Sequence, residues 1–155
     1  DQYNAIEIFS ENCNITQFIR NWVQDIEQNL YQAGRKQKEY FKKRIKFCQE
    51  TYKIFPESEE LFIKNVKRSE AESYFALGDY ETGDKKFKKI IEEYPHWVFG
   101  YLGWGDMYKP DSFIGSKPDQ EKALEIYQMA QEVELKGMGN PKRILKNRIS
   151  DLNDE

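Results

Sequence analysis

The stretch AESYFALGDYETGDKKFKKIIEEYPHWVFGYLGWGDMY, residues 71–108, decides the fold. Aromatic and small residues recur in it, and Tyr74 and Tyr108 are 34 residues apart. Antiparallel helices cross closely where one side chain is small, and large rings one turn away fill the space to the next helix. Gly78 predicts a helix end, because a helix C-terminus often needs a left-handed residue. Pro95 predicts another, because proline has no amide hydrogen to continue a helix. The stretch therefore predicts helical hairpins.

These spacings resemble the tetratricopeptide repeat (TPR), a helix-turn-helix unit with the signature aromatic-x2-Leu-Gly-x2-Tyr, then Ala-x3-Phe, then Pro. The residues at matching spacings are, in the first copy, Ala71-x2-Tyr74, Gly83-x3-Phe87 and Pro95, and in the second copy, Tyr101-x2-Trp104-Gly105-x2-Tyr108 and Ala123-x3-Tyr127. The resemblance implies an all-α, TPR-like solenoid of about three stacked antiparallel helical hairpins. It implies a single domain over residues 1–155, with repeats at about 15–56, 58–95 and 97–135 and a C-terminal capping helix over 141–152.

A second, fainter resemblance covers most of the chain. The segments YFKKRIKFC (40–48) and GYLGWGDMY (100–108) are similar to the helical-repeat region of bacterial proteins that also carry a small cysteine-rich SEC-C metal-binding motif. Cys13 and Cys48 alone cannot supply such a motif, so this resemblance implies that metal binding belongs to another part of such a protein. We therefore expect no metal and no cofactor in this chain.

The hydrophobic pattern extends the helical prediction to both sides of the central stretch. Apolar residues at three- and four-residue steps predict a first long helix from Ile15 to Gly34, with Glu27 where the repeat expects a small residue. We expect Ser58 and Asp119 to cap the helices that follow them, and Pro141 to open the final helix. That final helix is apolar on one side and charged on the other, as the end of a helical stack requires.

Composition favours a water-soluble helical protein. Charged residues make up 33% of the chain, the net charge is -3 and the mean hydropathy is -0.88. No apolar run approaches the ~20 residues that span a bilayer, and the start of the chain has neither the basic region nor the apolar core of a signal peptide. We expect a cytoplasmic protein without membrane contact, whose two cysteines are reduced thiols. The chain does not start with methionine, so it is compatible with a segment of a longer protein.

No pattern in the sequence predicts a catalytic site. His96 is the single histidine, so no histidine pair or cluster can form. The adjacent acids Glu59/Glu60 and Glu92/Glu93 point about 100° apart on a helix and do not face one substrate atom together. The glycines of Gly100-x2-Gly103-x-Gly105 lie in an expected helix, where small residues favour close helix crossing over phosphate binding. We expect a protein that is not an enzyme and has no catalytic residues.

The resemblance to the tetratricopeptide repeat also implies a binding surface. In that family the first helix of each hairpin lines a concave groove, which holds an extended peptide or a helix of a partner protein. The residues at the groove positions of this chain are Gln24, Gln28, Tyr31, Asn65, Arg68, Glu72, Phe75, Phe99, Leu102, Asp106 and Lys109. Leu102 stands where some relatives have a cation for a C-terminal carboxylate, which argues against that class of ligand. An alternative is that these residues pack against the terminal helices.

Function has to be argued from surfaces, since a fold alone fixes none. The leading hypothesis is a protein–protein interaction module, a scaffold or adaptor that binds a peptide segment or helix of another protein. Nucleic-acid binding is the alternative, through a basic run that could neutralise phosphates: Arg35, Lys36, Lys38, Lys42, Lys43, Arg44 and Lys46. Against it, charge runs on helices are usually solvated faces, and Glu39 and Glu50 dilute the field. A homodimeric structural domain of a larger protein is the third hypothesis.

Overall fold

The computed structural model describes residues 4–12, 19–109, 115–136 and 139–153. Within these ranges the chain forms helices and an isolated β-bridge between Trp97 and Lys136. The helices are α1 (Ile6–Asn12), α2 (Ile19–Lys36), α3 (Glu39–Ile54), α4 (Glu60–Leu77), α5 (Tyr80–Glu93), α6 (Val98–Asp106), α7 (Gln120–Gln131) and α8 (Pro141–Asn153). The prediction of an all-α protein is confirmed for this part of the chain. None of the helices in these ranges combines the length and the apolar character that a membrane span needs.

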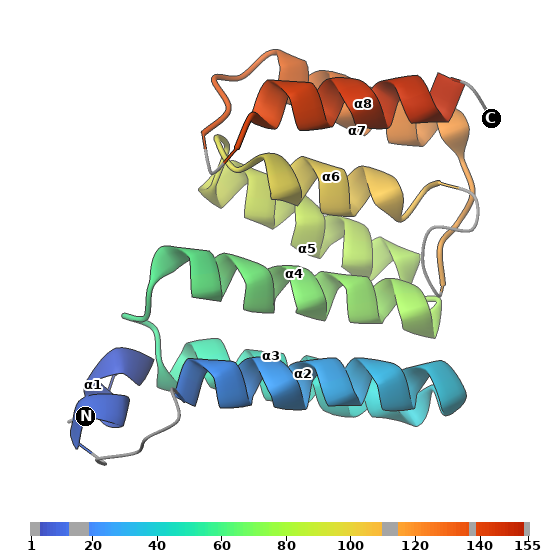
Figure 1. Ribbon diagram of the computed structural model, residues 1–155. Coiled ribbons are helices and arrows are strands. Elements are labelled where there is room, and N and C mark those ends of the chain that lie inside the picture. Colours follow the sequence, from blue (N-terminus) through green and yellow to red (C-terminus); the bar gives the residue numbers. More distant parts are fainter. Residues whose placement is uncertain (1–3, 13–18, 110–114, 137–138, 154–155) are drawn as a thin grey trace.

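The helices follow one another through the structure in chain order (Figure 1). From α1 to α8 each helix contacts the next one along the chain, and α4 also contacts α2 and α6, while α6 also contacts α8. In the view of Figure 1, α2, α4, α6 and α8 lie toward the viewer, with α3, α5 and α7 behind them. This order places helices from distant parts of the chain side by side on one face.

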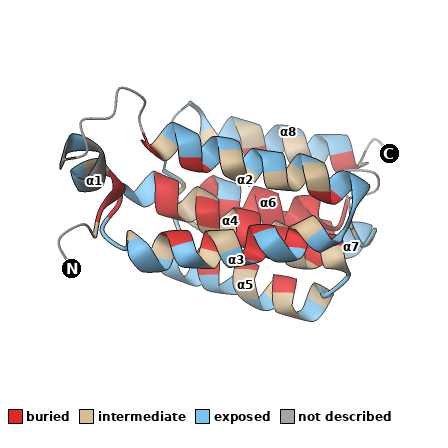
Figure 2. Cartoon of the chain, turned by 90° about the horizontal axis from the view of Figure 1, so that it is seen from below, coloured by how far each residue is buried: buried red, intermediate tan, exposed pale blue. Residues whose placement is uncertain are grey.

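The described residues form two hydrophobic cores, and the short helix α6 lies in the larger one. Every residue of α6 except Phe99 is buried (Figure 2). The larger core joins residues from α4 to α8, and the smaller one joins residues from α1 to α4. Because α4 contributes to both cores, it connects the two ends of the structure.

Phe75 lies in the middle of the larger core, so its prediction as a groove residue is wrong. Its ring is fully buried and makes edge-on contacts with Tyr80, Phe87 and Tyr108 at centroid distances of 5.6, 6.0 and 5.6 Å. Tyr74 is half-buried instead, and its hydroxyl is hydrogen-bonded to α3. Consecutive residues of a helix point about 100° apart, so only one of these two neighbouring rings enters the core.

Pairs of a glycine and an aromatic ring set the approach of neighbouring helices. The pairs are Gly34 with Phe41, Gly83 with Phe75 and Gly105 with Tyr127. A Cβ at Gly34 would lie 2.8 Å from the Phe41 ring, so a larger side chain would push α2 and α3 apart. Gly34 is therefore a packing residue within α2 and not the helix end that the sequence predicted. The predicted helix start at Ile15 lies outside the described residues.

Local signals set several helix ends as predicted. Gly78 ends α4 with a φ of 84°, Asp119 accepts a 3.0 Å hydrogen bond from a backbone N–H in the first turn of α7, and α8 begins at Pro141. Ser58 is the exception, since the N-terminus of α4 has no side-chain cap. The Ser58 hydroxyl instead accepts a 3.0 Å hydrogen bond from the backbone N–H of Ile6. It thereby holds α1 against the turn between α3 and α4.

Gly115 brings the segment between α6 and α7 into contact with the end of α4. It has a φ of 82°, and a Cβ at this position would overlap with the backbone of Phe75 and Ala76. The backbone N–H of Lys117 then donates a 2.8 Å hydrogen bond to the carbonyl of Met107. The described residues of this segment thus pack against the end of α4 and the end of α6.

Candidate functional site

A cavity of about 470 Å³ opens on the face formed by α2, α4, α6 and α8. Its lining combines charged groups with aromatic and aliphatic side chains. The lining residues, called the groove below, are Glu27, Gln28, Tyr31, Arg44, Arg68, Ser69, Glu72, Phe99, Leu102, Gly103, Asp106, Ile144 and Arg148. Apart from Arg44, which comes from α3, all of them belong to the four helices of that face. Helices far apart in the sequence thus build one site.

Most of the residues that the sequence placed in a groove lie together here. They are Gln28, Tyr31, Arg68, Glu72, Phe99, Leu102 and Asp106. The others do not line the cavity: Gln24 is exposed on α2, Asn65 is half-buried on α4, Lys109 is buried beyond the end of α6, and Phe75 is in the core. The terminal helix α8 contributes one wall through Ile144 and Arg148, and the cavity remains between that wall and α2.

Arg44 is held at the base of the groove by a buried ion network. Its Nε donates to Glu27 at 2.5 Å, its Nη1 to Ser73 at 3.0 Å and its Nη2 to Glu72 at 3.3 Å. Burial by itself would lower the pKa of Arg44, but the two carboxylates outweigh it and raise the pKa above its usual value. The side chain is 4% exposed, so the assignment of Arg44 to a nucleic-acid surface is wrong.

Several residues of the groove were not predicted. They are Glu27, Arg44, Ser69, Gly103, Ile144 and Arg148. The sequence did mark Glu27 as unusual, because it stands at a position where the repeat expects a small residue. A carboxylate at such a packed position needs a cation or hydrogen-bond donors, and Arg44 supplies both.

Arg68 on α4 and Arg148 on α8 also line the groove and are partly exposed. The Nε of Arg68 lies 3.3 Å from a carboxylate oxygen of Glu72, and the Nε of Arg148 lies 3.1 Å from one of Asp106. Neither Nε makes a directed hydrogen bond to any described residue. Both Nε atoms are themselves buried, although the side chains as a whole are 30% and 37% exposed.

Asp106 forms part of the floor of the groove. The Tyr127 hydroxyl donates a 2.5 Å hydrogen bond to it from α7. Burial raises the pKa of Asp106, although this hydrogen bond and the charge of Arg148 act in the opposite direction. Burial and the neighbouring carboxylate also raise the pKa of Tyr127, so its hydroxyl keeps its proton and remains the donor.

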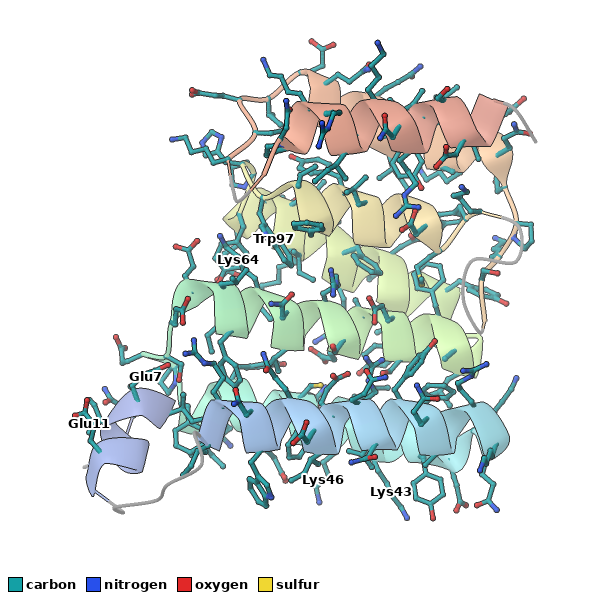
Figure 3. The ribbon with its side chains drawn as sticks, viewed as in Figure 1. Glu7, Glu11, Lys43, Lys46, Lys64 and Trp97 are labelled. Carbon is teal, nitrogen blue, oxygen red and sulfur yellow. The ribbon has the colours of Figure 1, made fainter. Side chains whose placement is uncertain are left out.

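A second cavity of about 530 Å³ adjoins the groove at Phe99. The residues that line it, called the aromatic cavity below, are Glu60, Leu61, Lys64, Glu93, Tyr94, Pro95, His96, Trp97, Phe99 and Lys136. The ammonium group of Lys64 lies 4.9 Å from the ring centroid of Tyr94 and 5.8 Å from that of Trp97 (Figure 3). Phe99 is 37% exposed and lines both cavities, so the two are neighbours on the structure.

His96 connects the turn before α6 to the segment before α8. Its Nδ1 lies 2.7 Å from the carbonyl oxygen of Glu134, so Nδ1 carries the proton and donates. The backbone N–H of Lys136 donates to the carbonyl of His96 at 2.8 Å. The single histidine is exposed, as expected for a turn residue, and these bonds give it a structural role.

The remaining basic residues of the predicted nucleic-acid run are exposed. They are Arg35, Lys36, Lys38, Lys42, Lys43 and Lys46. Lys43 and Lys46 on α3 point away from α4 (Figure 3). Lys46 pairs with Glu50 at 3.7 Å, and Lys43 lies 4.4 Å from the centroid of the Tyr40 ring. The basic side chains of the run are thus open to solvent, and Lys46 is paired with an acid.

No group of three or more His, Cys, Asp or Glu side chains in the described ranges is placed to hold a metal ion. Cys48 is buried in the smaller core, and burial raises the pKa of its thiol well above its usual value. A thiol in such surroundings is a poor nucleophile. Cys13 lies outside the described residues.

Comparisons with protein-family models, with curated proteins and with solved structures found no match. The function therefore has to be argued from the groove and the surfaces around it.

Proposed function

We propose that this protein is a TPR-like solenoid that binds a peptide segment or a helix of another protein in the groove, without catalysing a reaction. In this proposal the hairpins are α2–α3, α4–α5 and α6–α7, and α8 is the capping helix. Contacts between each helix and the next, together with the shared face of α2, α4, α6 and α8, support this architecture. The assignment of these hairpins to TPR-like repeats is based on the repeat spacings of the sequence.

The composition of the groove carries the functional proposal. Tyr31, Phe99 and two partly exposed arginines line an open cavity, and aromatic residues and arginine are enriched where proteins bind one another. The acids of the groove are occupied with structural bonds, since Glu27 and Glu72 bind Arg44. Such carboxylates are poor candidates for general acid–base work. The surface is therefore better suited to recognition than to catalysis.

A selection from a displayed library of random peptides tests the proposal. We expect peptides that bind the chain and lose at least tenfold in affinity when Tyr31→Ala and Phe99→Ala are combined. The control is Trp22→Ala, which removes a 56% exposed ring that does not line the groove. Loss of binding in Trp22→Ala, with full binding in the groove variant, would place the site elsewhere.

We propose nucleic-acid binding as the second candidate function, supported by the exposed lysines of α3. Titration with a labelled duplex at low and high salt tests it, because phosphate contacts weaken steeply with salt. Lys43→Gln combined with Lys46→Gln should reduce the affinity severalfold, whereas Lys142→Gln combined with Lys146→Gln on α8 is the matched control. The absence of binding at low salt would exclude this candidate.

A further inference from the structure

The two ends of the helix stack differ in the side chains that they expose. On α8 the described exposed residues are all polar, namely Lys142, Arg143, Lys146, Asn147, Ser150 and Asp151. At the opposite end, α2 and α3 form the bottom of the stack in Figure 1, which is the side seen in Figure 2. Trp22 on α2 and Ile54 on α3 are each 56% exposed, the highest values among the large hydrophobic side chains that the structure describes. Because the end of a helical stack needs a polar outer face, this end lacks the cap that α8 gives to the other.

Each of the two helices presents one row of residues at this end. Residues seven apart on an α-helix point within about 20° of one another. The row of α2 contains Trp22, Asn29 and Lys36, and the row of α3 contains Tyr40, Phe47 and Ile54. The rows meet at the turn between the helices, where a hollow of about 470 Å³ is lined by Gln32, Ala33, Lys36, Gln37 and Tyr40. The two rows and the hollow are called the end face below.

The end face is complementary to a second copy of itself. Trp22 lies seven residues before Asn29, and Lys36 lies seven residues after it. The exposed indole and the hollow are therefore equally far from Asn29 along α2. A two-fold axis near Asn29 packs the α2 helices of two copies antiparallel and places each Trp22 over the hollow of the other copy.

Two charged residues of α2 support the same arrangement. Asp25, one turn after Trp22, and Lys36, at the hollow, are both exposed, and neither forms an ion pair with a described residue. Within one copy they are about 16 Å apart along the helix, which exceeds the screening length of ~8 Å at physiological ionic strength. Across the two-fold axis, Asp25 faces Ala33 of the other copy, one turn from Lys36. Each copy thus offers an acid where the other offers a base.

We propose that the end face binds a second copy of this chain, in an antiparallel two-fold dimer with Asn29 near the axis. Trp22 is the central apolar contact, and tryptophan is among the residues that contribute most to binding between proteins. A two-fold contact repeats every interaction, so the interface gains two Trp22 rings and two pairs of Asp25 with Lys36. Tyr31, which lines the groove, points about 180° from Trp22 on α2. The dimer therefore leaves both grooves open and does not depend on peptide binding.

Light scattering after size exclusion, over protein concentrations from micromolar to millimolar, tests the dimer. We expect the mass to rise from one copy to two and no further, because a two-fold contact is closed. Trp22→Ala should raise the dissociation constant at least tenfold. Met129→Ala is the control, because it truncates a 41% exposed side chain on α7, away from the end face, and should leave the dissociation constant unchanged.

A charge exchange between copies tests the register of the dimer. Asp25→Lys and Lys36→Glu should each weaken self-association severalfold, because like charges then face each other across the axis. A mixture of the two variants should restore the dimer, since each copy then carries the charges that the other lacks. Asp151→Lys and Lys146→Glu, which make the same changes at exposed positions of α8, should have no effect.

Thermal unfolding of each variant identifies any that fails to fold, and the charge variants keep the test valid if Trp22→Ala does fail. A single-copy mass at every concentration would overturn the proposal. A dimer of unchanged affinity in Trp22→Ala or in both charge variants would place the interface elsewhere. Masses above two copies, or a mixture of Asp25→Lys with Lys36→Glu that stays monomeric, would refute the two-fold arrangement.

Discussion

Gly105 in α6 lies against the ring of Tyr127 in α7, and any side chain at position 105 would overlap with that ring. The contact holds Tyr127 where its hydroxyl reaches Asp106 on the floor of the groove. A packing contact inside the larger core is thereby linked to the lining of the candidate site.

Gly105→Ala should therefore destabilise the fold by about 1–3 kcal/mol, the usual cost of extra volume in a packed core. Gly100→Ala is the control, because its Cβ would lie 3.2 Å from an Ile91 methyl group, which needs only a small movement. Alanine is also favoured over glycine inside a helix by about 1 kcal/mol, so this control should be close to neutral. Thermal unfolding measures both variants. Equal Tm values would contradict the role of Gly105 in packing.

Gly115 and Gly139 form a second matched pair. Both have positive φ, at 82° and 80°, so alanine strains the backbone at either position. A Cβ at Gly115 would also overlap with the backbone of α4 at Phe75 and Ala76, whereas nothing lies within 4 Å of one at Gly139. We expect Gly139→Ala to cost about 1–2 kcal/mol and Gly115→Ala clearly more, as measured by urea unfolding. A larger loss in Gly139→Ala would show that residue 115 does not pack on α4.

Arg44→Met should lower the free energy of unfolding by about 3–5 kcal/mol, because it leaves Glu27 and Glu72 without their buried partner. Adding Glu27→Gln and Glu72→Gln should recover part of this loss, since the stranded charges are then removed. Lys43→Met, one residue away and exposed, should change the stability by less than about 0.5 kcal/mol. Chemical denaturation measures the series. Similar losses in Arg44→Met and Lys43→Met would argue against the buried network.

Asp106 should make the fold less stable as the pH rises. Burial raises its pKa above 3.8, so the folded chain still holds the proton where the unfolded chain has released it. Stability from this group therefore falls as the pH rises above 3.8 and levels off beyond the folded pKa. Asp106→Asn removes this dependence. The free energy of unfolding of the variant, relative to that of the wild type, should therefore increase as the pH rises from about 3 to 7.

Glu93 should have the opposite effect. Partial burial by itself favours its neutral form, but hydrogen bonds from Lys67 and Tyr94 outweigh burial and lower its pKa below 4.5. The stability that Glu93 contributes is present above pH 4.5 and is lost as the pH falls through the folded pKa. The free energy of unfolding of Glu93→Gln, relative to that of the wild type, should therefore decrease as the pH rises. Urea unfolding across this pH range measures both variants. If their stabilities relative to the wild type changed in the same direction with pH, the opposite pKa shifts assigned to Asp106 and Glu93 would be refuted.

The features that the sequence predicted correctly are local ones. The helix ends at Gly78 and Pro141 depend on backbone conformations that single residues determine. Ser58 was predicted incorrectly from its local position, because its hydroxyl accepts a hydrogen bond from the backbone of α1 rather than from the helix that follows it. Choosing between such partners requires the distances between segments that are far apart in the chain.

The groove was predicted only in part, because some of its contacts join segments that are far apart in the chain. Repeat spacing identified most positions that face it on α2, α4 and α6, but the neighbouring ring Phe75 was assigned to the groove although Gly83 makes room for it in the core. Arg44 was assigned to the surface. Its partners Glu27 and Glu72 come from two other helices, so a local basic run gives no sign that Arg44 is buried. The contribution of Arg148 depends on how α8 packs back onto α6, which no local pattern specifies.

Mapping of backbone amide shifts with a library-selected peptide shows whether the groove is the binding surface. We expect the largest shifts at Tyr31, Arg68, Phe99 and Arg148, with little change on the exposed face of α3 around Lys43. The largest shifts around Lys43, with the groove signals unchanged, would contradict it.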